Sequence, residues 1–154
     1  MNQRKLLAVV AHPDDESGSF GGTLALYARR GAAVEIVCAT CGEAARNRGQ
    51  AGSREELCET RRCEFRAACE VLGAAWSDIW DYPDGALNRQ TFHDLGLRIC
   101  RVIRERRPDV VITQGPEGGL TGHADHAAMA CFATFAFHAA GRTELFPECG
   151  AAHQ

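Results

Sequence analysis

The sequence predicts an α/β protein with a mainly parallel sheet that is covered by helices on both faces. Two observations carry this prediction. Short apolar stretches typical of buried strands alternate with helix-like stretches along the whole chain of 154 residues. Histidines and carboxylates stand in the segments that follow the first and the fourth apolar stretches. At this length the chain fits a single domain, 1–154, and it contains no internal repeat or low-complexity block.

Four short apolar stretches predict the strands. The first is an uninterrupted apolar run, and the second is again mostly apolar. The third is weaker, and Pro108 with Asp109 introduces the fourth. In chain order the expected strands are Leu6–Ala11, Ala33–Ala39, Ala75–Trp80 and Val110–Thr113.

A helix is expected after each strand, with glycine marking three of the four helix ends. Gly31, Gly73 and Gly141 stand where these helices end, and two arginines occupy the last turn of the first one. A polar loop through Arg54 precedes the second helix, and the turn 82–85, YPDG, precedes the third. The expected helices are Leu24–Arg30, about Glu55–Leu72, about Phe92–Arg106 and about His123–Ala139.

Two polar clusters follow the first and the fourth predicted strands. The segment AHPDDE starts at Ala11, and the segment TQGPEGGLTGHADH ends at His126. In the commonest doubly wound sheet the strand order is 3-2-1-4, so that the first and fourth strands are neighbours where the winding reverses. Ligands bind outside the carboxyl ends of the strands at that point. We therefore expect the two clusters, more than 100 residues apart, to meet in one crevice.

The two clusters offer residue types that can hold a catalytic metal. Zinc takes imidazole nitrogen and carboxylate oxygen, and catalytic sites keep three protein ligands with one position open. His12 and Asp15 can supply two ligands and His126 the third. Iron(II) suits the same set. Alternatively, the acidic residues only cap helix starts and complement the helix dipole, which is the common role of a single acidic turn.

Three further residues of the clusters suit a hydrolase. Asp14 can take the proton of a water that attacks a carbonyl beside the metal. His123 can stabilise the oxyanion or protonate the leaving amine. Asp125 can orient one of the two neighbouring imidazoles.

The composition of the chain indicates which class of molecule the protein binds and in which cellular compartment it is expected. A net charge of −3 and no basic footprint argue against nucleic acid and favour a small polar substrate. No apolar run is long enough to span a membrane, and the N-terminus lacks a signal-peptide core, so we expect a cytoplasmic protein. Eight cysteines without an export signal indicate reduced thiols, with a single C-x-x-C at Cys38 and Cys41. Five others lie in helical patterns as small apolar residues: Cys58, Cys63, Cys69, Cys100 and Cys131.

The motifs resemble those of the PIG-L or LmbE-like family of zinc-dependent N-deacetylases. The resemblance covers residues 4 to about 148 and rests on five segments in order: AHPDDESGSFGG, VEIVCATCGEAARNRG, TRRCEFRAACEVLG, DYPDG and GHADH. It implies a Rossmann-like three-layer fold. It also implies removal of acetyl from an N-acetylglucosamine-type amino sugar conjugate.

The resemblance also implies roles for eight residues. The zinc ligands correspond to His12, Asp15 and His126, and the general base to Asp14. His123 matches the histidine that assists the tetrahedral intermediate or the leaving group, with Asp125 as its orienting carboxylate. Arg61 and Asp84 match residues that bind the sugar; Arg61 can equally be a solvated helix charge.

Members of this family usually continue beyond the equivalent of Glu148 with strands that complete the sheet and part of the substrate pocket. The short C-terminus therefore predicts an open edge at the fourth strand and self-association into a homo-oligomer. It also motivates an alternative function, a module that binds metal but is catalytically silent.

Overall fold

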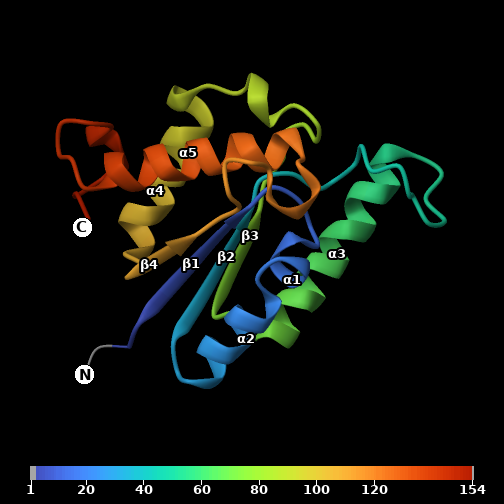
Figure 1. Ribbon diagram of the computed structural model, residues 1–154, viewed down its shortest axis with the longest axis horizontal. Helices are drawn as coiled ribbons and strands as arrows, with labels where there is room; N and C mark the ends of the chain where they lie inside the picture. The colour runs from blue at the N-terminus through green and yellow to red at the C-terminus, as the bar shows by residue number, and fades with distance from the viewer. Residues whose placement is uncertain (1–2, 154) are drawn as a thin grey trace.

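The computed structural model describes residues 3–153 as one parallel sheet between two layers of helices (Figure 1). The strand order is β3-β2-β1-β4, so β1 and β4 are neighbours as the sequence predicts. Every paired strand is parallel to its neighbour. The strands are β1 (Lys5–Val10), β2 (Ala33–Cys38), β3 (Trp76–Ile79) and β4 (Val110–Ile112).

The helices cover both faces of the sheet. In Figure 1, α4 and α5 lie on one face and α1, α2 and α3 on the other. This arrangement confirms the predicted three-layer architecture. The helices are α1 (Asp15–Gly18), α2 (Gly21–Arg29), α3 (Arg54–Leu72), α4 (Leu97–Arg106) and α5 (Ala124–Ala140), and a π-helical turn (Phe92–Gly96) precedes α4.

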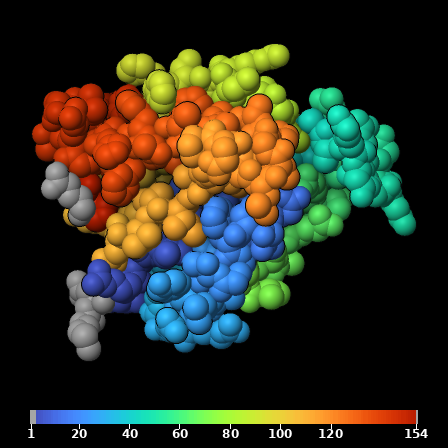
Figure 2. Space-filling model, in the orientation of Figure 1, coloured from blue at the N-terminus to red at the C-terminus, as the bar shows by residue number. Residues whose placement is uncertain are grey.

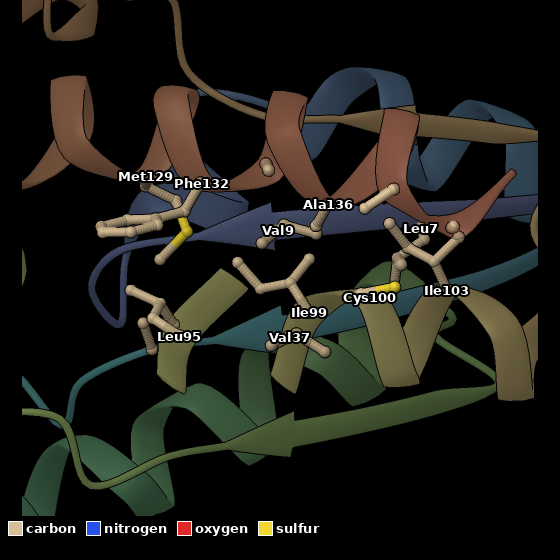
Figure 3. Packing of buried hydrophobic residues seen from close by; sticks show 14 of the residues in the cluster. Leu7, Val9, Val37, Leu95, Ile99, Cys100, Ile103, Met129, Phe132 and Ala136 are labelled. Carbon is tan, nitrogen blue, oxygen red and sulfur yellow. The ribbon is translucent and has the colours of Figure 1, made fainter. Parts of the chain in front are cut away.

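Two apolar cores form because alternate residues of each strand point to opposite faces. Leu7 and Val9 of β1 pack with Ile99 of α4 and with Met129 and Phe132 of α5 (Figure 3). Leu6, Ala8 and Val10 enter the second core, beneath α2 and α3. β1 is buried on both faces, which explains its uninterrupted apolar sequence.

The helices differ from the sequence prediction at two places. The acidic segment after β1 forms a helix of its own, α1, which the sequence analysis did not expect. The predicted helix from Phe92 starts instead with the π-helical turn and continues as α4. Gly73 ends α3 as predicted; it has φ 76°, a left-handed conformation that glycine adopts without a steric penalty.

Arg104 of α4 is a buried charge that the sequence analysis did not single out; its exposure is 4%. Its guanidinium donates hydrogen bonds to carbonyl oxygens at the end of α5 and in the segment after it. The closest are those of Phe146 at 2.5 Å, Arg142 at 2.6 Å and Leu145 at 2.7 Å. The other acceptors are the carbonyls of Ala139, Ala140 and Gly150. This side chain therefore fastens the C-terminal segment to α4.

The cysteines correct the expectation of reduced thiols. Cys41, after β2, forms a disulfide with Cys58 of α3, and their Cα atoms are 5.0 Å apart. Cys58 is therefore not simply a small apolar residue of a helix. Cys63 and Cys131 are exposed, which was also not expected, whereas Cys69 and Cys100 are buried as predicted. The Cys38 thiol donates to the carbonyl of Thr40 and is not paired with Cys41.

We expect thiol labelling of the denatured, unreduced protein to modify six cysteines, and eight after reduction. Reduction should also lower the stability by about 3 kcal/mol, because the disulfide closes a loop between residues 17 apart. Mass spectrometry gives the number of labels, and urea unfolding gives the stability. Eight labels before reduction would show that the bond is absent.

β3 and β4 form the two edges of the sheet. β4 is therefore an edge strand, as the sequence predicts, and the side chain of Val110 on it is exposed. Among residues 3–153, no helix has the length and apolar character needed to cross a bilayer.

Candidate active site

The two polar clusters meet at the carboxyl ends of β1 and β4, as predicted. In Figure 2 the segment after β4 (orange) lies against the segment after β1 (blue). Between them is a pocket of about 530 Å³. It is lined by His12, Asp14, Asp15, Ala44, Ala45, Arg46, Arg61, Asp84, Gly85, Thr121, His123 and His126. Seven of the eight residues singled out from the sequence line this pocket, and the eighth, Asp125, lies buried directly behind His12.

Three side chains converge in a way that suits one small cation. His12 Nδ1 lies 3.2 Å from His126 Nε2. The Asp15 carboxylate is 3.5 Å from His12 Nδ1 and 3.1 Å from His126 Nε2. Ligands about 2 Å from a tetrahedral centre lie a little over 3 Å from one another, so two imidazole nitrogens and one carboxylate fit the requirements of zinc.

The second nitrogen of each imidazole has a partner of its own. His12 Nε2 faces two carboxylates, Asp84 at 3.0 Å and Asp125 at 3.3 Å. His126 Nδ1 lies 3.1 Å from the carbonyl oxygen of Gly118. Partners on the far nitrogen orient a ligating histidine and raise its basicity. Both rings are therefore held with the remaining nitrogen toward Asp15.

Two other groups of ligand atoms share His12. His12, His123 and His126 form one, and His12, Asp84 and Asp125 form the other. In the second group the carboxylates already hold Nε2 of His12, which is the orienting role. In the first group His123 uses its Nδ1 as a helix cap. The set of His12, Asp15 and His126 leaves all of these contacts intact, and we therefore prefer it.

The charges in this cluster stabilise one another. Burial lowers the pKa of His12, but the neighbouring carboxylates, Asp125 foremost, outweigh burial and raise it to about 11. Burial would raise the pKa of Asp15, yet its hydrogen bonds with His12 bring the net pKa below the ordinary value. The pKa values of Asp84 and Asp125 are lowered in the same way, against the effect of burial, by contact with His12.

Asp14 has a strained backbone and an exposed carboxylate. It precedes α1 with φ 105°, a conformation that costs a non-glycine residue of the order of 1–3 kcal/mol. Its side chain does not cap the helix and faces the pocket instead. The buried Glu16 accepts a hydrogen bond from the backbone amide of Asp14 at 3.0 Å and so supports this turn. This role of Glu16 was not predicted from the sequence.

Arg61 of α3 fastens the same turn from the other side. Its guanidinium lies 2.6 Å from the Asp14 carboxylate and also donates to the carbonyl oxygens of Pro13 and Gly42. A side chain at position 42 would collide with this guanidinium, since a Cβ there would stand 2.3 Å from it. The structure therefore gives Arg61 a structural role beside the sugar contact that the resemblance implies.

His123 caps α5 rather than starting it. Its Nδ1 accepts a hydrogen bond from the backbone amide of Asp125 at 3.2 Å. The neutral ring must then carry its proton on Nε2, where it can serve as a donor. The Asp125 carboxylate, however, does not contact His123 as the resemblance implies. It accepts from His12 and from the amides of Gly85 and Leu87, and so it orients His12.

Asp84, which was singled out from the sequence, and Glu43, which was not, couple the loops after β2 and β3. The Asp84 carboxylate accepts from the amide of Ala44, and the Glu43 carboxylate accepts from the amide of Asp84, both at 2.9 Å. Arg46 and Thr121 also line the pocket. Glu43, Arg46 and Thr121 all lie in segments that follow strands of the parallel sheet. Because ligand sites form at the carboxyl ends of such strands, this position in the chain could have indicated them.

The fold and the site define a class: a Rossmann-like α/β protein whose histidines and carboxylates gather where the sheet winding reverses. The model of one family, described as PIG-L: GlcNAc-PI de-N-acetylase, matches residues 7–137. The chain belongs to this family, as the resemblance of its motifs indicated.

One relative of this chain is a bacterial deacetylase. The chain is 36% identical over 178 aligned residues to the 1D-myo-inositol 2-acetamido-2-deoxy-alpha-D-glucopyranoside deacetylase of Rhodococcus opacus. The match covers 97% of this chain and 58% of that enzyme, so the chain spans little more than half the length of this relative.

Two solved structures share the fold. N,N'-diacetylchitobiose deacetylase from Pyrococcus horikoshii matches with a TM-score of 0.86 over 96% of this chain and 54% of that one, at 24% identity, which establishes the fold alone. The 4-carboxy-2-hydroxymuconate hydratase from Pseudomonas putida matches with a TM-score of 0.84 at 26% identity, over 99% of this chain and 63% of that one.

Proposed function

We propose that this chain catalyses the metal-dependent hydrolysis of the acetamide of an N-acetylglucosamine-type conjugate. The observation that carries the proposal is the convergence of His12 Nδ1, Asp15 and His126 Nε2 beside Asp14 and His123 in one pocket. The names of the family and of the Rhodococcus enzyme support an acetylated amino sugar as the substrate.

The cation would be held by His12, Asp15 and His126, and zinc or iron(II) both suit this donor set. When bound, such a cation polarises a carbonyl oxygen and makes a nearby water more acidic. Asp84 and Asp125 orient the His12 ring by accepting from Nε2. The chain's own acids and bases carry out the proton transfers.

Asp14 and His123 face the pocket from opposite clusters. The Asp14 carboxylate takes the proton of the water that attacks the acetamide carbonyl, and Arg61 holds it in place. His123 donates from Nε2, either to the oxyanion or to the leaving amine. Arg61 and Asp84 line the same pocket, and we also propose them as contacts for the sugar hydroxyls.

Metal removal tests this proposal. We expect about one zinc or iron per purified chain, and acetate release from an N-acetylglucosaminyl conjugate that stops on chelation and returns with Zn²⁺. His126→Ala should lose the metal and the activity together, because it removes one of three ligands. His138→Ala, on the same helix but away from the pocket, is the matched control. A metal-loaded wild type without acetate release would favour the catalytically silent module.

The likeness to a hydratase supports a second candidate function, the addition of water to an unsaturated carboxylic acid. The same residues could activate that water. The two reactions are separated by their products, because only deacetylation releases acetate, whereas hydration removes the ultraviolet absorbance of a conjugated substrate.

A further inference from the structure

The Cys41–Cys58 disulfide fastens the loop after β2 to helix α3. In Figure 1 this loop (teal) and α3 (green) extend together beyond the end of the sheet, away from α4 and α5. Cys41 is 5% exposed and Cys58 is half-buried, so a reagent reaches the bond from the side of Cys58. The three residues that follow Cys41 in the chain all take part in contacts that lead to the active site.

The first of these contacts leads to Asp14. The carbonyl oxygen of Gly42 accepts a hydrogen bond from Arg61 at 3.2 Å, and Arg61 also lies 2.6 Å from the Asp14 carboxylate. Arg61 follows Cys58 by three residues on α3, so the disulfide and this hydrogen bond join the same two segments within one helical turn. Without the disulfide, only weak bonds would keep the Gly42 carbonyl against Arg61.

The other two contacts lead to His12. The Glu43 carboxylate accepts from the amide of Asp84, and one oxygen of Asp84 accepts from the amide of Ala44, both at 2.9 Å. The second oxygen of Asp84 lies 3.0 Å from Nε2 of His12. The position of the loop beside the disulfide therefore affects how both His12 and Asp14 are held.

The other six cysteines of the chain are free thiols. In an environment that keeps thiols reduced, a disulfide is usually transient and acts in catalysis or redox sensing. Six unpaired cysteines suit such an environment. The one pair that is formed joins the segments that hold Asp14 and His12, which suits a sensing role.

We propose that the Cys41–Cys58 pair is a redox modification site at which a thiol reductant lowers the activity of the enzyme. The thiolate of the reductant attacks Sγ of Cys58, the S–S bond breaks, and Cys41 leaves as a thiolate that takes up a proton. A second thiol of the reductant then displaces Cys58 from the mixed disulfide. The two cysteines gain two electrons and two protons, and the reductant, a dithiol or two molecules of glutathione, becomes a disulfide. The inference rests on the proposed function, because acetate release is the activity that changes.

Limited proteolysis tests the loop without any measurement of activity. Arg46 and Arg48 are exposed in this loop, and trypsin cleaves after arginine. We expect reduction to speed cleavage at these two sites about tenfold, because a segment must open locally before a protease can cut it. Cleavage after Arg30, which is exposed at the end of α2, should keep its rate, because the rest of the fold stays intact. Unchanged cleavage of the loop would overturn the inference.

Acetate release from an N-acetylglucosaminyl conjugate is the second measurement. In a large excess of reduced glutathione the kcat should fall about tenfold, because small displacements of catalytic groups slow a reaction steeply. It should return in oxidised glutathione, and metal analysis of both states controls for removal of the cation by the thiol. A bond that survives reduced glutathione, or equal kcat in both states, would overturn the inference and leave the proposed function intact. Faster loop cleavage without acetate release in either state would contradict the proposed function and support the redox control of the loop.

The double variant Cys41→Ser, Cys58→Ser lacks the bond without any reductant. It should show the low kcat and the fast loop cleavage of the reduced protein, and glutathione should change neither. Cys63→Ser removes a free thiol on the same helix and is the matched control; it should respond to glutathione like the wild type. A double variant with the kcat of the oxidised wild type would contradict the inference. The measurements on the wild type hold even if the double variant does not fold.

Discussion

Replacing Asp14 by asparagine should lower kcat for acetate release by about 10²–10⁴-fold, the usual contribution of a general base. The amide keeps the shape of the carboxylate and can still accept from Arg61, but it cannot take a proton. Asparagine tolerates a positive φ better than most residues, so the strained turn should persist. Metal content and KM should therefore change little.

The control for this variant is Asp81→Asn. Asp81 is an exposed carboxylate that pairs with Arg62, the residue next to Arg61 on α3, but it lies outside the pocket. It should retain wild-type kinetics. If Asp14→Asn kept more than about a tenth of the wild-type kcat, the base would have to be another group.

Replacing Arg104 by methionine should destabilise the protein by about 3–5 kcal/mol, a large share of the stability of a typical domain. The change removes the hydrogen bonds of the guanidinium to the carbonyl oxygens of Ala139, Arg142 and Leu145, and a hydrogen bond to a charged group contributes about 1.5–3 kcal/mol. It also removes a positive charge from the negative end of the α5 dipole. Urea unfolding measures the loss.

Arg101→Met on the exposed side of the same helix should change the stability by less than about 0.5 kcal/mol. Arg104→Lys keeps the charge but has fewer donors in a different geometry, so it should fall between the wild type and Arg104→Met. It also provides a measurable value if the methionine variant does not fold. Equal stability of Arg104→Met and the wild type would contradict this account.

Elements whose signal is local were predicted correctly from the sequence. The apolar run of β1 and the glycine after α3 depend on residues close in the chain, and both elements formed within two residues of the predicted bounds. The strand order followed from the general topology of such sheets, and with it the meeting of His12 and His126.

Contacts that join distant segments through side chains were not predicted from the sequence. The Cys41–Cys58 bond depends on how the loop after β2 folds back onto α3, and the spacing of the cysteines does not show this. The partner of Asp125 is another example. Its place in GHADH suggests the adjacent His123, but the first turn of α5 directs the carboxylate toward His12 on the other segment.

By itself, therefore, the sequence determined the α/β architecture, the family and the residues that meet at the carboxyl edge, because hydrophobic periodicity and short motifs are properties of neighbouring residues. Only the tertiary structure decided which nitrogen of His12 faces Asp15 and which carbonyl oxygens Arg104 holds. These features depend on side-chain directions and loop paths in space, which are fixed only when the segments pack against one another.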